Sequence, residues 1–468
     1  MKKTLVTLSA AILAGILLWT ACGRRAHGPE SIILITLDTL RPDHLGCYGH
    51  PAVRTPNLDR LASKSARFLQ AVTVVPTTLA SHLSILTGTY PRTHGVGRNG
   101  FRAGPENLTL AEILRDQGYA TAAFVSAFSL DARFNLNQGF DIYDCTYDPS
   151  IGPRTADQAQ RRAQATTDAV LRWLERCEEG PIFLWVHYFD PHYPYDPPGE
   201  YADLYDPGYA GPADGSIAYL EDVWQKRRFP GPEDRRHIIS LYDGEISYMD
   251  EHLGRLLDAM ERSDLLQHSI VVVVGDHGES LGEHGYDFDH GLYVYDASIR
   301  VPLLIHAPDI PGGRVVPHQV ETIDLMPTVL DLLGRPTPLS VEGRSLRPLM
   351  RGEPGWTERT AFSEASKPWN VEPDSGDVFQ NAWKAKCART STWKYIYTPF
   401  ADSRELYLLR DDPAEITNRL GPNIDVARAL EDELEAWAER PRSRVSVEDL
   451  TPDPETLEKL KSLGYIQD

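Results

Sequence analysis

The stretch that decides the fold is Ser31-Ile-Ile-Leu-Ile-Thr-Leu-Asp38, a continuous apolar run that ends in a carboxylate. Runs of this kind are typical of a strand that is buried on both faces of a parallel sheet. In open α/β sheets, functional groups gather at the carboxyl ends of the strands, and Asp38 follows this strand directly. The stretch therefore predicts a central strand and marks one edge of a functional site.

Segments on either side of this strand extend the same pattern. Buried strands are predicted at residues 119–125, 181–187 and 269–275, and helices at residues 107–117 and about 236–260. Strands that alternate with helices, with polar residues after each strand, are typical of a doubly wound α/β fold. We therefore predict an α/β chain with a mostly parallel sheet.

The pattern changes after residue 352, where short β-type segments precede a single helix. The β-type segments are residues 393–397 and 405–409, and the helix covers about residues 424–437. This order predicts a smaller C-terminal α+β subdomain. We place the catalytic domain at residues 30–352 and the C-terminal subdomain at residues 353–468.

Composition narrows the possible partners. The 468 residues are 41% hydrophobic and 24% charged, close to globular averages, and 47 Lys and Arg against 67 Asp and Glu leave a net charge of −20. A field of that sign repels nucleic acid, so no nucleic-acid partner is expected. A small anionic substrate would need a local positive centre such as a metal ion. The scattered cysteines contain no Cys-x-x-Cys pair, which excludes a zinc knuckle.

The first 22 residues predict export. Lys2 and Lys3 precede an apolar stretch that is too short for a comfortable membrane span, and Leu18-Trp-Thr-Ala-Cys22 follows. This arrangement resembles a bacterial lipoprotein signal, in which a lipid on Cys22 anchors the protein to a membrane. The alternative is ordinary signal cleavage after Gly23, which gives a periplasmic or secreted protein. In either case the protein leaves the cytoplasm, and we place a linker at residues 23–29.

Two polar pairs follow predicted strands, and they carry the chemistry. Asp38-Thr39 ends the first strand, and Asp276-His277 ends the strand at residues 269–275. Carboxylates, an imidazole and a hydroxyl are ligands for a divalent cation, and strand ends that are distant in sequence can meet in such a sheet. We predict one metal ion, either calcium, manganese or zinc, held by Asp38, Asp276 and His277, with Thr39 or Thr78 completing the ligand set.

The sequence resembles the sulfatase family of the alkaline phosphatase superfamily over nearly the whole mature chain. The motifs that carry this resemblance are Ile33 to Gly49, Thr55 to Ala62, Leu83 to Pro91, Pro191 to Pro194, Asp276 to Gly285, Val301 to Leu303 and Asp324 to Asp331. The resemblance implies an alkaline phosphatase-like fold and the hydrolysis of an anionic ester at a metal site.

The chain departs from this family at the position that decides its chemistry. Sulfatases carry Cys or Ser, which is converted to formylglycine, within Cys-x-Pro-x-Arg, whereas Thr78 and His82 stand at the two ends of the equivalent stretch. Formylglycine is therefore not expected here. The Lys-x-His stretch of the family is also missing, because Phe124-Val-Ser-Ala127 stands in its place.

The remaining site residues take their roles from the resemblance and from local context. Thr78 is the predicted nucleophile, although its alternative role is the cap of a following helix. His82 would orient Thr78, contact the substrate or simply pack. His192, between two prolines, matches the family position that protonates the leaving group, and His290 falls near the family's substrate-binding lysine.

Together these residues predict a metal-dependent hydrolase of sulfate, phosphate or phosphonate esters, with a small or glycan-type anionic substrate. One alternative is a transferase that passes a phosphate-type group to an acceptor other than water. The other is a catalytically silent protein that keeps the fold and binds a ligand, which the loss of the formylglycine residue favours. The four residues Asp38, Asp276, His277 and His192 count against the silent protein.

Overall fold

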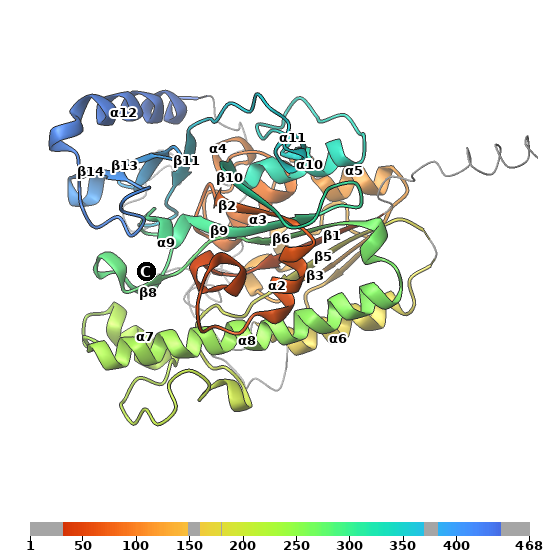
Figure 1. Cartoon of the computed structure of the whole chain (residues 1–468), viewed down its shortest axis with the longest axis horizontal. Helices are drawn as coiled ribbons and strands as arrows, with labels where there is room; N and C mark the ends of the chain where they lie inside the picture. Colours follow the sequence, from red (N-terminus) through yellow and green to blue (C-terminus); the bar gives the residue numbers. More distant parts are fainter. Residues whose placement is uncertain (1–30, 148–159, 179, 369–381, 441–468) are drawn as a thin grey trace, which may run out of the picture.

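The computed structural model describes residues 31–147, 160–178, 180–368 and 382–440 (Figure 1). Its centre is an eight-stranded sheet with the strand order β10-β2-β9-β6-β1-β5-β3-β4. The strands are β1 (Ser31–Leu37), β2 (Ala66–Val72), β3 (Ala120–Phe124), β4 (Ile142–Asp144), β5 (Ile182–Tyr188), β6 (Ser269–Gly275), β9 (Arg300–His306) and β10 (Arg314–Glu321). Only β9 runs antiparallel to its neighbours in this sheet, β2 and β6. The prediction of a mostly parallel sheet is confirmed.

Strand β1 lies between β5 and β6, and all seven of its residues are buried. Thr36 pairs with His187 of β5, and Leu37 pairs with Gly275 of β6. The three strands are parallel, so their carboxyl ends lie side by side at one edge of the sheet. This register brings Asp38 and Asp276 to the same edge.

Helices cover both faces of the sheet, as a doubly wound fold requires (Figure 1). One face packs against α3 (Thr78–Thr87), α5 (Leu110–Asp116) and α10 (Leu325–Leu332), and the other against α2 (Pro56–Ser63), α6 (Ala163–Leu174) and α8 (Pro232–Arg262). Side chains alternate along β1, because Leu34 joins the first core whereas Ile33 and Ile35 join the second.

The boundaries of the predicted helices shift for local reasons. Helix α5 begins at Leu110 rather than near residue 107, because Thr109 and Glu112 form a capping box. Helix α8 begins at Pro232, about four residues earlier than predicted, with proline in its first turn. In both helices the feature that sets the first residue is one that the spacing of apolar residues does not reveal.

The C-terminal part is a separate four-stranded antiparallel sheet with a helix. Its elements are β11 (Ala361–Glu364), β12 (Lys386–Arg389), β13 (Trp393–Thr398), β14 (Ser403–Leu408) and α12 (Ile424–Ala438). A buried ion-pair group joins it to the main body, because Arg389 and Lys394 both bind the Asp296 carboxylate. The predicted α+β subdomain is therefore present and is fixed against the larger sheet.

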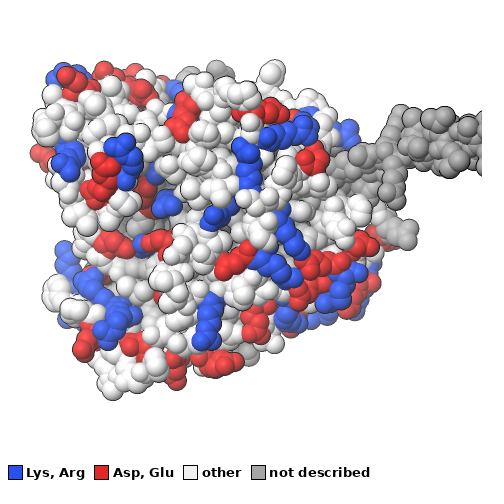
Figure 2. All heavy atoms as spheres, in the orientation of Figure 1, with Lys and Arg blue, Asp and Glu red and all other residues white. Residues whose placement is uncertain are grey.

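Three other features of the chain are its cysteines, its surface charge and its N-terminal region. Cys47, Cys145, Cys177 and Cys387 are free thiols. On the face shown in Figure 2, acidic and basic side chains of the described residues are interspersed. The predicted signal and linker at residues 1–29 lie outside the described residues, and no helix within the described ranges is long and apolar enough to cross a membrane.

Candidate active site

Asp38, Asp276 and His277 converge at the carboxyl edge of the sheet. One ligand atom from each residue lies within 4.8 Å of the others. Nε2 of His277 lies 3.4 Å from Oδ2 of Asp276 and 3.8 Å from Oδ1 of Asp38. The three side chains thus form a compact group that could hold a metal ion.

The backbone after β1 turns sharply to build this group. Thr39 has a φ angle of 52°, a left-handed conformation that is costly for a β-branched residue. Its amide donates to Oδ1 of Asp276, and its carbonyl accepts from the Tyr242 hydroxyl. The amide of His277 donates to the same Asp276 oxygen. Asp276 therefore uses Oδ1 to hold both strand ends together and leaves Oδ2 for another partner.

Several buried oxygen atoms at this site lack hydrogen-bond partners among the described residues. They are both carboxylate oxygens of Asp38, Oδ2 of Asp276 and the hydroxyl oxygen of Thr39. Burial raises the pKa of Asp38 and of Asp276, and the mutual repulsion of the two carboxylates raises the pKa of Asp276 further. A divalent cation would satisfy these oxygens and supply the missing positive charge, so the residues present fit a metal ion.

His277 has the tautomer that a metal ligand needs. Its Nδ1–H donates to the carbonyl of Gly278 at 2.9 Å. In a neutral imidazole the other nitrogen then carries a lone pair, and here that nitrogen is Nε2, which faces the two carboxylates. The imidazole can therefore add a nitrogen ligand to the oxygen ligands.

Thr78 is the first residue of α3 and lies next to this group. Its Oγ1 is 3.4 Å from Nε2 of His277, and the side chain is fully buried. Thr77 occupies the cap position of the helix, and the amide of Leu79 is bound by Oδ1 of Asn99. Thr78 itself makes no capping hydrogen bond, and its hydroxyl faces Nε2 of His277.

His82 lies one turn further along α3 and contacts the main chain of Thr78. Its Nδ1–H donates to the Thr78 carbonyl at 2.7 Å, and the same nitrogen lies 3.6 Å from Oδ2 of Asp276. Burial lowers the pKa of His82 to about 3, so the ring is neutral at pH 7. These contacts favour a role in holding Thr78 in place over direct contact with a substrate.

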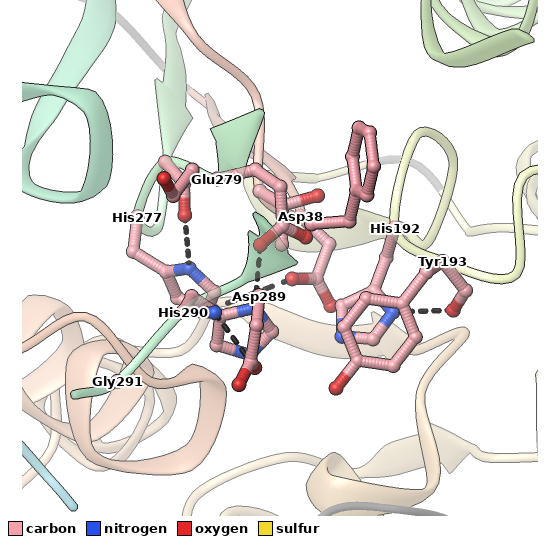
Figure 3. Close-up of polar contacts among 12 residues, drawn as sticks. Asp38, His192, Tyr193, His277, Glu279, Asp289, His290 and Gly291 are labelled. Carbon is pink, nitrogen blue, oxygen red and sulfur yellow. Dashed lines mark hydrogen bonds and ion pairs between the residues drawn. The ribbon is translucent and has the colours of Figure 1, made fainter. Parts of the chain in front are cut away.

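His290 lies between two other imidazoles: its ring centroid is 4.4 Å from that of His277 and 5.2 Å from that of His192 (Figure 3). Nδ1–H of His192 donates to the Tyr193 carbonyl, so its Nε2 is the nitrogen left for proton transfer. Burial lowers the pKa of His192 to about 4, and the negative charge of Asp38 opposes that shift. Nδ1 of His290 lies 3.2 Å from Oε1 of Glu279.

The structure adds residues that the sequence did not single out. Nε2 of His187, within β5, is 3.4 Å from Oδ2 of Asp38. Glu279 contacts His290, and Nζ of Lys367 binds both oxygens of Asp289, the residue before His290. His187 was detectable as a lone polar residue in an apolar strand. Lys367 was not, because only the tertiary fold brings the C-terminal part to this site.

Comparisons with known proteins agree with this fold. The sulfatase family model matches residues 30–335, and the model of the N-sulphoglucosamine sulphohydrolase C-terminal region matches residues 282–440. An ulvan-active sulfatase of Formosa agariphila is 29% identical over 429 residues, which cover 87% of this chain and 80% of the relative. An arylsulfatase of Clostridium perfringens is 27% identical over 453 residues, which cover 83% of this chain and 89% of the relative.

A solved structure shows the same architecture. A phosphonate monoester hydrolase from Silicibacter pomeroyi superposes with a TM-score of 0.71 at 23% identity, over 87% of this chain and 94% of the other. This likeness concerns the fold alone. The sulfatase model, by contrast, matches more than half of the residues in order, and the chain therefore belongs to the sulfatase family of ester hydrolases.

Proposed function

We propose that this chain is a metal-dependent hydrolase of phosphate-type esters, such as phosphate diesters or phosphonate monoesters, and that Thr78 is its nucleophile. The observation that carries the proposal is the contact of 3.4 Å between Oγ1 of Thr78 and Nε2 of His277, inside the group that also contains Asp38 and Asp276. A divalent cation held by that group would lower the pKa of the hydroxyl and offset the negative charge of the ester.

In the proposed first step, Thr78 has lost its proton to solvent, and its oxygen attacks phosphorus in line with the departing alcohol. A new P–O bond forms to Thr78 as the bond to the leaving oxygen breaks. For this step His192 must be protonated on both nitrogens, a charged form that the neighbouring Asp38 carboxylate favours: its Nδ1–H stays on the Tyr193 carbonyl and its Nε2–H passes to the leaving oxygen. In the second step, water attacks phosphorus, His192 takes a proton from the water, and Thr78 is released.

The threonine favours phosphorus over sulfur. A formylglycine hydrate has a second hydroxyl and expels sulfate by breaking its own C–O bond, whereas a threonine ester has no such hydroxyl. The ester on Thr78 must be cleared by water that attacks the central atom. Phosphoryl transfer needs little beyond positioning and charge neutralisation, so this route suits phosphorus. Two of the relatives are named an ulvan-active sulfatase and an arylsulfatase, so a sulfate ester must be included among the substrates that are tested.

The test is an ester screen with purified protein, freed of metal with a chelator and then loaded with Mn²⁺, Zn²⁺ or Ca²⁺. We expect kcat/KM for bis-4-nitrophenyl phosphate or 4-nitrophenyl phenylphosphonate to exceed that for 4-nitrophenyl sulfate by about 100-fold. A preference for the sulfate ester would overturn the substrate assignment. Absence of both metal binding and turnover would support the silent binding protein instead.

We also propose that the protein is exported and anchored by a lipid on Cys22. The support is the basic start, the apolar stretch and the cysteine at the end of the signal-like segment. A Cys22→Ala variant should appear in the soluble fraction, whereas the parent protein should sediment with membranes. If the variant sediments as the parent does, the lipid anchor is wrong.

A further inference from the structure

We propose that His187 is a positioning residue, which donates its Nε2–H to Oδ2 of Asp38 and so fixes the carboxylate for the cation. The inference rests on the proposed metal-dependent function. The side chain of His187 is fully buried, and its Nε2 lies 3.4 Å from that oxygen, just beyond the roughly 2.7–3.2 Å of an N–H···O hydrogen bond. Neither atom has a hydrogen-bond partner in the described part of the chain, so a closer approach of a few tenths of an ångström would satisfy both.

The strand register explains why this contact forms. Strands β5 and β1 are parallel. On one face of the sheet, a β5 side chain contacts the β1 residue that lies two positions after the one it pairs with. Trp185 pairs with Leu34, and its indole N–H donates to the hydroxyl of Thr36. His187 is two residues further along β5 and pairs with Thr36, so its ring reaches Asp38. The pattern follows from the sheet geometry, since alternate residues share a face.

The other side of the ring shows which nitrogen carries the proton. The amide of Ser126 donates to Nδ1 of His187 at 3.3 Å, so Nδ1 is an acceptor and the ring proton lies on Nε2. The hydroxyl of Ser126 donates to the His187 carbonyl and is also 2.7 Å from the hydroxyl of Thr166. Two contacts from Ser126 therefore hold both the ring and the main chain of His187.

This tautomer makes His187 a donor to Asp38 and not a metal ligand. A metal-binding nitrogen needs a lone pair, as Nε2 of His277 has, whereas Nε2 of His187 carries a hydrogen. Partners that orient a ligating carboxylate in this way typically change metal affinity by 10- to 100-fold when they are removed. His187 thus completes one side of the site that Asp38, Asp276 and His277 form.

A matched pair of variants tests this assignment. His187→Gln keeps an N–H donor at about the reach of Nε2, whereas His187→Leu fills similar space without a donor. We expect the dissociation constant for Mn²⁺, measured by calorimetry, to rise by about 10- to 100-fold in His187→Leu and to stay within about threefold in His187→Gln. The buried His94, which binds Ser84 away from this site, gives the control His94→Gln, with unchanged affinity.

Each outcome has a separate meaning. Equal Mn²⁺ affinity in the parent protein and in His187→Leu would overturn the inference and leave the proposed function intact. Weak binding in both His187 variants would overturn the donor role, since a donor alone would not suffice. A parent protein that binds no divalent cation would overturn the proposed function and this inference with it. His187→Met, which also lacks an N–H, replaces the Leu variant if the latter does not fold.

Discussion

Oγ1 of Thr78 lies 3.4 Å from Nε2 of His277, although 199 positions separate the two residues in the sequence. The contact joins the first turn of α3 to the end of β6, and it puts a hydroxyl next to the histidine that groups with the buried carboxylates of Asp38 and Asp276. A helix start and a strand end thus bring the proposed nucleophile to the proposed metal-binding group, and this juxtaposition makes the role of Thr78 testable.

Thr78→Ala should lower kcat by about 1,000-fold or more, because it removes the attacking oxygen. The fold should survive, since Thr78 makes no capping bond and Asn99 already holds the Leu79 amide. Steady-state kinetics and a thermal melt measure the two effects. Thr87→Ala, on the same helix, is the control and should keep its turnover, because within the described ranges the Thr87 hydroxyl binds Leu83 and Thr89 and no active-site residue.

Thr78→Ser should retain measurable turnover, because it keeps a hydroxyl at the same position. Mass spectrometry of the active parent protein should show an unmodified Thr78. Undiminished turnover in Thr78→Ala would exclude the covalent route and leave direct attack by water on the ester.

Asp276→Asn should abolish metal binding while it preserves the turn between the two strand ends. The amide oxygen of Asn can still accept from the amides of Thr39 and His277, but the negative charge on Oδ2 is lost. A cation present at 100 times its dissociation constant stabilises the folded state by about 2.7 kcal/mol. A chelator should therefore lower the Tm of the parent protein and leave that of Asp276→Asn unchanged.

The matched control for that experiment is Asp258→Asn on the surface of α8, where the carboxylate pairs with Arg60. Its Tm should respond to the chelator as the Tm of the parent protein does. If Asp276→Asn also keeps the chelator response, the cation is held elsewhere and the strand-end site is wrong.

The sequence was sufficient to predict the sheet and the convergence of Asp38 and Asp276 at its strand ends. Apolar runs that end in polar residues are typical of buried parallel strands. The sequence could not reveal site residues that come from a neighbouring strand or from the C-terminal part. His187 reaches Asp38 through the register between β5 and β1, and Lys367 reaches Asp289 through the packing of the C-terminal part. Such contacts depend on tertiary geometry, which residue spacing along one strand does not encode.

The predicted helix cap at Thr78 shows a related limit. A threonine before an apolar helical run is a usual cap signal, and the structure gives the cap position to Thr77. Asn99 binds the Leu79 amide from a distant loop and takes over part of the capping function. The Thr78 hydroxyl is therefore available to the site, although local pattern alone does not distinguish the two roles.

Buried histidines should lower the free energy of unfolding in acid. His94 lies outside the active site, so it allows this effect to be measured without a change at the site. Burial lowers its pKa to about 3 in the folded state, against about 6.5 when unfolded. Between these values the unfolded state binds one more proton, so the free energy of unfolding falls as the pH is lowered from 6.5 toward 3. The slope for one proton is about 1.4 kcal/mol per pH unit.

His94→Gln should reduce that slope by about one proton, as measured by urea unfolding at several pH values between 4.5 and 7. Ser84→Ala is the control, because it removes the hydrogen-bond partner of His94 and leaves the titrating ring. It should lower the free energy of unfolding without removing the slope. A slope in His94→Gln equal to that of the parent protein would mean that His94 is protonated in the folded state.

The role of His192 can be separated from that of Thr78 through the leaving group. A general acid matters when the departing alcohol is strongly basic and matters little when the departing group is a stable anion such as 4-nitrophenolate. His192→Ala should therefore lower kcat/KM by about 100-fold or more for an alkyl ester and by less than about 10-fold for the matching 4-nitrophenyl ester. Tyr193→Phe is the control, since it keeps the backbone carbonyl that binds Nδ1 of His192, and it should affect both esters equally.

An equal loss on the two esters in His192→Ala would show that the histidine binds or positions the substrate. A loss confined to the alkyl ester would identify it as the proton donor, because no binding role depends on the basicity of the group that leaves.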